Sequence, residues 1–536
     1  MSIAEIIENM SLEEKVGQLF QVGFSDTKAD NNIKDMIENY HIGGVIYFSR
    51  NLNSLKQTAE LSNQLQELAL NSKSEIPLFI SADQEGGIVT RLRGGTHFPG
   101  NMALGATGSN VLAEKAGKAT ATELKNTGIN MNLAPVLDVN NNPANPVIGV
   151  RSFGEDPDLV ANLGYSYFAG LQSEGVIACG KHFPGHGDTD LDSHLSLPVI
   201  RHNRERLNKI ELVPFKRAID QGIDSIMTAH VHFPAIEKEI GIPATLSKKV
   251  LTGLLRKELN FKGLIITDCM EMNAIADSFG TVEGAIRAFI AGSDVILISH
   301  SYQKQKRAIK AMKEAVKSNR ISEKRINKSL KRILELKQKR IGIGRRKIKK
   351  ADPKKINLKY NQRIAEEISR ASVTLLKGEN VVPIEDIKNK KISVVNFSIK
   401  KGSLVEDNKN ENNVFIDYLN KKIDDLKHFD YKDRQGIDKK DDKEFKNSDY
   451  IIVCISDGEK NRKQIKIAEK IAENNKVITV ALRNPYDFKY IKNSDAFLTT
   501  YDYSPSNQRA AVDIITGEIK AKGKLPVKVR NEKNEK

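Results

Sequence analysis

Cysteine is scarce in this chain of 536 residues, which contains only Cys179, Cys269 and Cys454. An odd number of widely separated cysteines argues against a disulfide framework and is typical of a reducing compartment. Long apolar runs are also lacking: no stretch of about 18 apolar residues occurs, so we expect no membrane span. The first residues show neither a basic segment nor an apolar core of a signal peptide, which predicts a cytoplasmic protein. An extracellular location stays open if a leader was removed.

Acidic residues are outnumbered, because the net charge is +16, but the excess is unevenly distributed. Residues 341–536 contain 43 Lys and Arg against 30 Asp and Glu. Such an excess can mark a surface for nucleic acid or another anionic polymer. Here the two signs are interleaved and no motif combines aromatic with basic residues, so we expect a lysine-rich solvated surface and no nucleic-acid partner.

A regular alternation of apolar runs and helical stretches fills residues 1–340. Eight such runs with helices between them predict a (β/α)8 TIM-type barrel. A doubly wound open sheet is the alternative, but no glycine-rich phosphate-binding turn follows the first run. The expected strands are residues 19–24, 44–48, 77–82, 130–135, 176–181, 225–230, 264–267 and 295–299.

Polar residues cluster directly after these runs. Catalytic groups of such barrels come from the carboxyl ends of several strands, which strengthens the barrel prediction. The residues are Asp83, Gln84 and Glu85 after the third run, Asp138 and Arg151 after the fourth, Lys181 and His182 after the fifth, His230 and His232 after the sixth, and Asp268 after the seventh.

The remaining chain predicts a connector and a second domain. Residues 341–360 are basic, contain Pro353 and lack a clear period, as expected of an inter-domain connector. Residues 361–536 carry four strand-like runs and two helical stretches, which predict a smaller α/β sandwich domain. Within it, residues 401–447 are rich in Asn, Lys and Asp and are expected to be irregular.

The segment 181–194 (KHFPGHGDTDLDSH) concentrates reactive side chains. Pro184, Gly185 and Gly187 preclude an ordinary helix, so we expect a loop after the fifth strand. Within it, Asp192 can orient the imidazole of His194 and tune its pKa for proton transfer. A metal site built from its histidines and aspartates, or a polar loop satisfied by its own hydrogen bonds, remain alternatives.

Asp268 follows the buried run 264–267. An aspartate at this place can act as a nucleophile toward an anomeric carbon, or it can cap the helix expected at residues 269–276. Groups from other strand ends can then bind sugar hydroxyls, since such sites need several convergent donors and acceptors. These groups are Asp83, Arg91, Arg151, Lys181 and His182.

Four ordered motifs in residues 10–340 resemble glycoside hydrolase family 3, and more narrowly its β-N-acetylglucosaminidase branch. A weaker resemblance extends into the second domain through residues 371–377. The motifs are residues 181–194, 82–87 (ADQEGG), 151–157 (RSFGEDP) and 266–272 (ITDCMEM).

The resemblance implies a retaining β-N-acetylhexosaminidase that removes terminal N-acetylglucosamine from peptidoglycan fragments or related oligosaccharides, without metal or cofactor. Asp268 would be the nucleophile and His194 the general acid/base, oriented by Asp192. The first sugar subsite would be formed by Asp83, Arg91, Arg151, Lys181 and His182, with His186 a weaker candidate.

A histidine in place of the usual second carboxylate affects which molecule can accept the glycosyl group from the enzyme. A neutral imidazole does not repel an anion, so phosphate is expected to compete with water. A phosphorylase is therefore one alternative. A family 3 β-glucosidase is disfavoured by the Asp192-Ser193-His194 triplet, and a catalytically silent carbohydrate-binding protein is the non-enzyme alternative.

Overall fold

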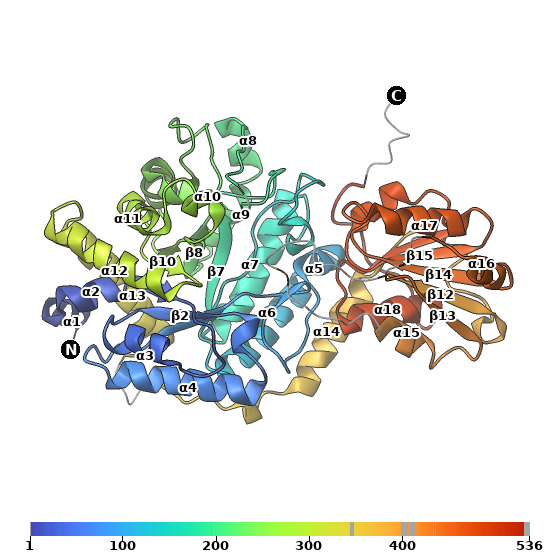
Figure 1. Cartoon of the computed structure of the whole chain (residues 1–536), viewed down its shortest axis with the longest axis horizontal. Helices are drawn as coiled ribbons and strands as arrows, with labels where there is room; N and C mark the ends of the chain where they lie inside the picture. The colour runs from blue at the N-terminus through green and yellow to red at the C-terminus, as the bar shows by residue number, and fades with distance from the viewer. Residues whose placement is uncertain are drawn as a thin grey trace.

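The computed structural model describes residues 2–193, 196–343, 348–397, 406, 414–432, 434 and 436–529. The chain forms a large domain and a smaller one that lie side by side (Figure 1). No helix in the described part of the chain is both long and apolar enough to cross a membrane. The three cysteines are buried free thiols.

The large domain is built on a parallel sheet that closes into a barrel. Among the described residues its strands follow the order β10–β1–β2–β3–β6–β7–β8–β9. A bridge between Ile266 and Val295 links the last strand to β10 and closes the ring. The predicted barrel is therefore confirmed, and each expected run overlaps one strand, although the fifth strand extends to Phe183, so His182 lies within it rather than after it. The strands are β1 (Phe20–Val22), β2 (Gly44–Tyr47), β3 (Phe79–Ala82), β6 (Met131–Asn132), β7 (Ile177–Phe183), β8 (Ser225–Thr228), β9 (Leu264–Ile266) and β10 (Ile296–Ile298).

Helices cover the outside of the barrel, and polar residues define where several of them begin. The hydroxyl of Ser54 accepts a hydrogen bond from the amide of Gln57 at the start of α4. Asp156 caps α7, which has Pro157 at its first position, where its missing N–H costs nothing. The bounds are α1 (Ile3–Asn9), α2 (Leu12–Gly17), α3 (Asn31–Glu38), η1 (Ser49–Asn51), α4 (Leu55–Asn71), α5 (Asn101–Thr107), α6 (Asn110–Asn126), η2 (Gly149–Arg151), α7 (Pro157–Ser173), α8 (Arg204–Lys209), α9 (Val213–Asp220), η3 (Ala244–Leu246), η4 (Lys249–Glu258), α10 (Asn273–Ala276), α11 (Thr281–Ala291), α12 (Tyr302–Lys317) and α13 (Glu323–Arg340), with a hairpin of β4 (Gln84–Gly86) and β5 (Val89–Thr90).

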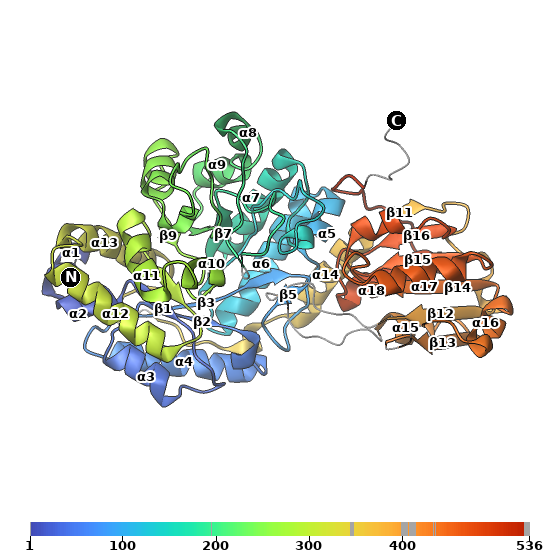
Figure 2. The same cartoon turned by 45° about the horizontal axis from the view of Figure 1, so that its top comes forward.

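The smaller domain is a sheet covered on both faces, with α15 and α18 on one side and α16 and α17 on the other (Figures 1 and 2). In the described residues the strand order is β11–β16–β15–β14–β12–β13, and β11 is antiparallel to its neighbour. The elements are β11 (Thr374–Lys377), η6 (Ile387–Asn389), β12 (Ile392–Asn396), α15 (Val414–Leu419), β13 (Leu426–Asp430), α16 (Lys439–Lys446), β14 (Tyr450–Ile455), α17 (Arg462–Ala472), β15 (Val477–Ala481), η7 (Pro485–Tyr490), β16 (Ala496–Thr499) and α18 (Pro505–Ile515).

The expectation of an irregular segment at residues 401–447 is wrong for its described part. That part contributes α15, the edge strand β13 and α16. β13 lies at the edge of the sheet and leaves most of its side chains partly or fully exposed, so no apolar run marks it. The charged sequence of α16 likewise buries only Asp441 and Phe445. Both elements depend on tertiary contacts rather than on a strong local pattern.

Helix α14 (Leu358–Ser372) joins the two domains. It begins inside the predicted connector, after the short turn η5 (Pro353–Lys355), so the expected boundary at residue 361 falls within one helix. Ile364, Ala365 and Ile368 belong to the core of the barrel, while the helix also packs against α18. The second sheet begins only after this helix, at β11.

The interface between the domains contains a small apolar core and buried polar contacts. Tyr486, Tyr501 and Tyr503 pack with residues of the hairpin and of α5. The buried carboxylate of Asp502 accepts a hydrogen bond from the amide of Gly100 at 2.7 Å. These contacts hold the second domain against the carboxyl-end side of the barrel that carries the hairpin.

Candidate active site

A cavity of about 410 Å³ lies at the carboxyl ends of the barrel strands. It is lined by charged side chains from five different strand ends together with apolar groups. Of the residues expected from the sequence to form the site, it contains Asp83, Arg91, Arg151, Lys181, His182 and Asp268. Further lining residues include Phe48, Arg50, Glu85, His186, Ser193, His300 and Glu406.

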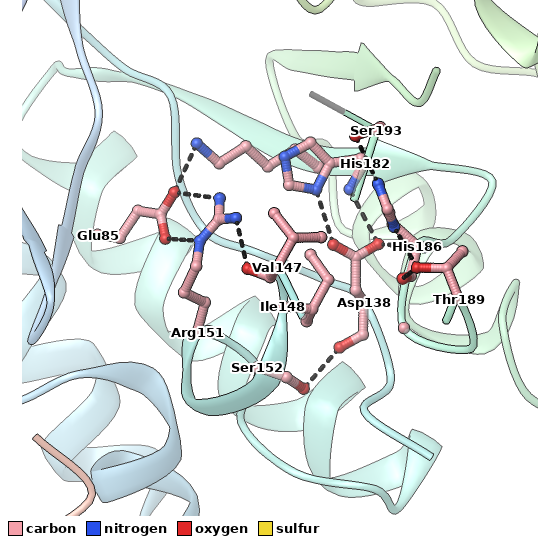
Figure 3. A network of polar contacts seen from close by, with 12 residues as sticks. Glu85, Asp138, Val147, Ile148, Arg151, Ser152, His182, His186, Thr189 and Ser193 are labelled. Carbon is pink, nitrogen blue, oxygen red and sulfur yellow. Dashed lines mark hydrogen bonds and ion pairs between the residues drawn. The ribbon is translucent and has the colours of Figure 1, made fainter. Parts of the chain in front are cut away.

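Glu85 is the centre of an ionic network on one wall (Figure 3). Its carboxylate accepts two hydrogen bonds from the guanidinium of Arg151, both at 2.8 Å. The ammonium of Lys181 lies 2.7 Å from an oxygen of Glu85 and 2.7 Å from Asp83. Arg91 lies 3.9 Å from the other oxygen of Asp83. The cations are therefore positioned before any substrate arrives.

Electrostatics keep the network ionised although it is out of water. Burial disfavours the charged form of Glu85, but Arg151 and Lys181 outweigh burial and hold the pKa of this carboxyl far below its usual range. Burial would also lower the pKa of Lys181, yet Asp83 and Glu85 raise it. Two carboxylates thus compensate two buried cations.

Asp138 fixes the first histidine of the loop. It is fully buried, and one of its oxygens lies 2.7 Å from Nδ1 of His182. The other oxygen accepts the backbone N–H groups of His182 and His186, at 3.1 and 2.7 Å. Burial acts to raise the pKa of Asp138, but the facing His182 brings it below its ordinary value. Asp138 therefore fixes both the ring orientation of His182 and the course of the loop.

His186 holds the following loop together from within. Its ring nitrogens lie 3.0 Å from the hydroxyl of Thr189 and 2.9 Å from that of Ser193. Asn145 donates to the carbonyl groups of His186 and Gly187 at 2.9 Å each. Burial, together with the neighbouring His182, lowers the pKa of His186 to about 4, so its ring is neutral at pH 7.

The residues expected to transfer the proton belong to the end of this loop. Asp192 is half-buried, next to Ser193, whose hydroxyl contacts His186. His194 lies outside the described residues, so its role stays a prediction. Asp268 follows β9, is half-buried and lines the cavity, and its carboxylate accepts the amide of Cys269 at 2.7 Å. The helix expected from residue 269 begins only at Asn273, so Asp268 does not cap it.

Two groups of the network were not among the predicted site residues. Glu85 and Asp138 stand in the polar clusters that follow the third and fourth strands, so the signal was present in the sequence. Their function as counter-charges depends on partners 44 to 96 positions away along the chain. His230, which follows the sixth strand, bonds to the hydroxyl of Thr245 and to the carbonyl of Cys269, the residue after Asp268, whereas His232 bonds to the carbonyl of Ile242.

The metal interpretation of the loop finds little support in its geometry. Among the described residues, the group with metal-ligand spacing is Asp188, His202 and Glu211, which lacks His182 and His186. The guanidinium of Arg206 lies 3.4 Å from both Asp188 and Glu211, so a cation of the protein already stands between these two acids.

A closed (β/α)8 barrel with a preformed ionic cavity at its carboxyl rim is the architecture of a barrel enzyme that binds a polar substrate. The family model of the glycosyl hydrolase family 3 N-terminal domain matches residues 11–336, and that of the family 3 C-terminal domain matches residues 373–536. The chain belongs to glycosyl hydrolase family 3.

Two similar curated relatives are named beta-hexosaminidase. The chain is 36% identical over 375 residues to beta-hexosaminidase A of Pseudoalteromonas piscicida, which covers 66% of this chain and 62% of the relative. It is 40% identical over 264 residues to a beta-hexosaminidase of Nitrosomonas eutropha, covering 48% of this chain and 73% of the relative. The chain thus spans less than two thirds of the first of these relatives.

A solved structure matches nearly the whole chain. The family 3 β-N-acetylglucosaminidase of Paenibacillus sp. strain FPU-7 shares 41% identity and superimposes with a TM-score of 0.89, over 97% of this chain and 99% of that one. Both domains and their arrangement therefore have a counterpart at substantial sequence identity.

Proposed function

We propose that this protein is a retaining β-N-acetylhexosaminidase that hydrolyses terminal, β-linked N-acetylglucosamine. The observation that carries the proposal is one cavity that Asp268 lines together with a preformed set of polar and charged groups: Asp83, Arg91, Arg151, Lys181 and His182. The names of the relatives and of the matching structure support the same activity.

The wall of the cavity formed by Asp83, Glu85, Arg151 and Lys181, the ionic wall, suits the binding of a single sugar ring. Lys181 and Arg151 are buried and compensated by Asp83 and Glu85, so they can donate hydrogen bonds without changing their protonation. Hydroxyl groups require donors and acceptors in fixed directions, and bidentate or doubly bonded groups provide them. The network thereby positions the anomeric carbon toward Asp268 at little entropic cost on binding.

In the proposed mechanism, Asp268 attacks the anomeric carbon and forms a glycosyl ester, while the aglycone leaves with a proton. His194 donates that proton and then accepts one from the incoming water, with Asp192 stabilising the protonated ring. His186 is unsuited to this task, because its pKa of about 4 and its two hydroxyl partners keep it neutral and engaged.

Replacement of Asp268 by asparagine tests the proposal directly. The variant loses the nucleophile but keeps the size of the side chain, so release of 4-nitrophenol from the β-N-acetylglucosaminide should fall by at least about 1,000-fold. His194→Ala should lose most activity on the same substrate, and external azide should restore part of it, because azide attacks the glycosyl ester without base assistance, frees the Asp268 carboxylate and leaves as the glycosyl azide. Asp277→Asn, at an exposed position, is the matched control and should retain full activity.

An unaffected rate in Asp268→Asn would contradict the assignment, and absence of any sugar release by the wild-type chain would favour a silent binding protein. Product analysis with added phosphate separates the acceptors, since glycosyl phosphate would indicate phosphorolysis. Defined fragments with and without a muramyl unit would distinguish peptidoglycan from chitin oligosaccharides as the preferred glycan.

A further inference from the structure

The mouth of the cavity carries a second group of residues, which we call the rim cluster: Phe48, Arg50 and His300. Phe48 and Arg50 follow β2, and His300 follows β10, the two strands that flank β1. In the order of the barrel, β1 lies opposite β7, which carries Lys181 and His182. Arg50 and His300 are exposed and Phe48 is half-buried, whereas the ionic wall is buried.

The side chains of the rim cluster are fixed by the protein itself. Nε of Arg50 donates to the carbonyl of Phe24 at 2.8 Å, and Nη2 donates to the carbonyl of Ser299 at 2.9 Å. The guanidinium carbon lies 4.4 Å from the centre of the Phe48 ring, and the His300 ring lies 5.3 Å from it. An aromatic surface with a cation beside it is therefore formed in advance.

Unlike the buried cations, Arg50 forms its side-chain hydrogen bonds with uncharged groups. Lys181 and Arg151 are bonded to carboxylates, but the two bonds of Arg50 go to neutral carbonyl oxygens. Since a guanidinium has five N–H groups, donors remain for a ligand.

The acid beside the rim cluster, Glu271, is engaged elsewhere. Its carboxylate accepts the backbone N–H groups of His300 and Ser301, at 2.6 and 3.1 Å, and lies 3.8 Å from the ammonium of Lys304. Arg50 and Lys304 thus face one acid on this side of the mouth, while burial and the neighbouring Arg50 lower the pKa of His300 and disfavour its charged form. The balance favours a negatively charged ligand over a cationic one.

We propose that the rim cluster is the subsite for the aglycone, the unit on the far side of the scissile bond, and that it favours an aglycone with a carboxylate. The inference rests on the proposed function, because the ionic wall must hold the terminal sugar for the rim to meet the next unit. Phe48 lines the cavity and offers apolar surface to that unit, and Arg50 offers hydrogen-bond donors that match a carboxylate.

Two aryl N-acetyl-β-D-glucosaminides that differ in one group test this subsite: the 4-carboxyphenyl and the 4-carbamoylphenyl compound. The measured quantity is the ratio of their kcat/KM values in each variant, so the difference between the leaving groups cancels. In Arg50→Gln the ratio of acid to amide should fall at least about threefold, as expected for a partly exposed ion pair. Arg50→Lys keeps the positive charge and should retain much of the preference for the acid.

Arg217→Gln is the matched control, because Arg217 also lies over an aromatic ring, that of Tyr165, but outside the cavity. Its ratio should equal that of the wild type. Should Arg50→Gln fail to fold, the wild-type ratio itself should fall as sodium chloride rises from about 50 mM to about 500 mM, since salt screens the attraction. A ratio unchanged by both salt and Arg50→Gln overturns the proposal.

Binding separates this inference from the proposed function. The dissociation constants of the two corresponding 1-thioglycosides, which resist hydrolysis, can be measured by calorimetry on the wild type and on Arg50→Gln. Loss of the preference for the acid in Arg50→Gln supports the subsite even if the chain hydrolyses neither aryl glycoside, in which case the proposed function alone fails. Equal preference in both proteins overturns the subsite even if hydrolysis is rapid.

Discussion

At the scale of single residues, Glu85 shows how a site of buried charges is kept intact. It neutralises Arg151 and Lys181 together; without it Arg151 would lose its carboxylate partner and Lys181 would keep only Asp83. In Glu85→Gln we expect the free energy of unfolding at pH 7 to fall by about 3–5 kcal/mol, because buried cations lose their partner. Urea unfolding measures it, and Glu205→Gln, which breaks an exposed pair with Lys209, should change it by less than about 1 kcal/mol.

The sign of the pH dependence follows from the lowered pKa of Glu85. A carboxyl group with a depressed pKa contributes stability above its unfolded pKa of about 4.3 and loses it as the pH falls toward the folded value. The difference between wild type and Glu85→Gln should therefore be full at pH 7 and shrink below about pH 4. A difference that grows on acidification would contradict this account.

The lowered pKa of His186 predicts a change of stability in a different pH range. Its pKa in the folded chain is about 4 against 6.5 unperturbed, so it contributes fully above pH 6.5 and loses this contribution as the pH falls to about 4. Between pH 7 and pH 4.5 the wild type should lose roughly 2 kcal/mol of its free energy of unfolding through this group, a loss that should be missing in His186→Gln. Urea unfolding at pH 7 and pH 4.5 measures it. His428→Gln, at an exposed position on β13, should follow the wild type.

At the scale of elements, the loop after β7 is positioned by a close backbone contact between Gly187 and Val139. A Cβ atom on Gly187 would lie 1.7 Å from the carbonyl oxygen of Val139, so only glycine fits there. In Gly187→Ala we expect the loop to shift and kcat to fall about 100-fold, while far-UV circular dichroism stays that of a folded barrel. Gly253→Ala in η4 is the control, because its Cβ would meet only the Lys248 carbonyl at 3.8 Å. Equal kcat values would show that the loop tolerates the shift.

At the scale of the whole molecule, the second domain is held to the barrel by buried contacts rather than by a flexible connector. The Asp502 carboxylate, bonded to the amide of Gly100, crosses the interface beside the three tyrosines. Asp502→Ala leaves that amide without its acceptor, and the free energy of unfolding should fall by about 1–3 kcal/mol. Urea unfolding followed by tyrosine fluorescence measures it, with exposed Asp277→Ala as the control. An unchanged midpoint would show that the apolar contacts suffice.

The sequence by itself determined the barrel, because eight apolar runs and the polar residues after them reflect strands whose carboxyl ends must meet at one rim. It also determined which residues reach the cavity from β3, η2, β7 and β9, since their position relative to a strand end dictates the direction in which they point. Strand β13 and helix α16 escaped prediction, because an edge strand and a charged surface helix need little apolar periodicity. The tertiary structure alone decided that Glu85 pairs with Arg151 and Lys181, that Asp138 orients His182, and that Arg50 and Phe48 face the cavity together with His300. Such pairings join residues up to 252 positions apart, and local sequence carries no information on which distant charge or ring will lie opposite.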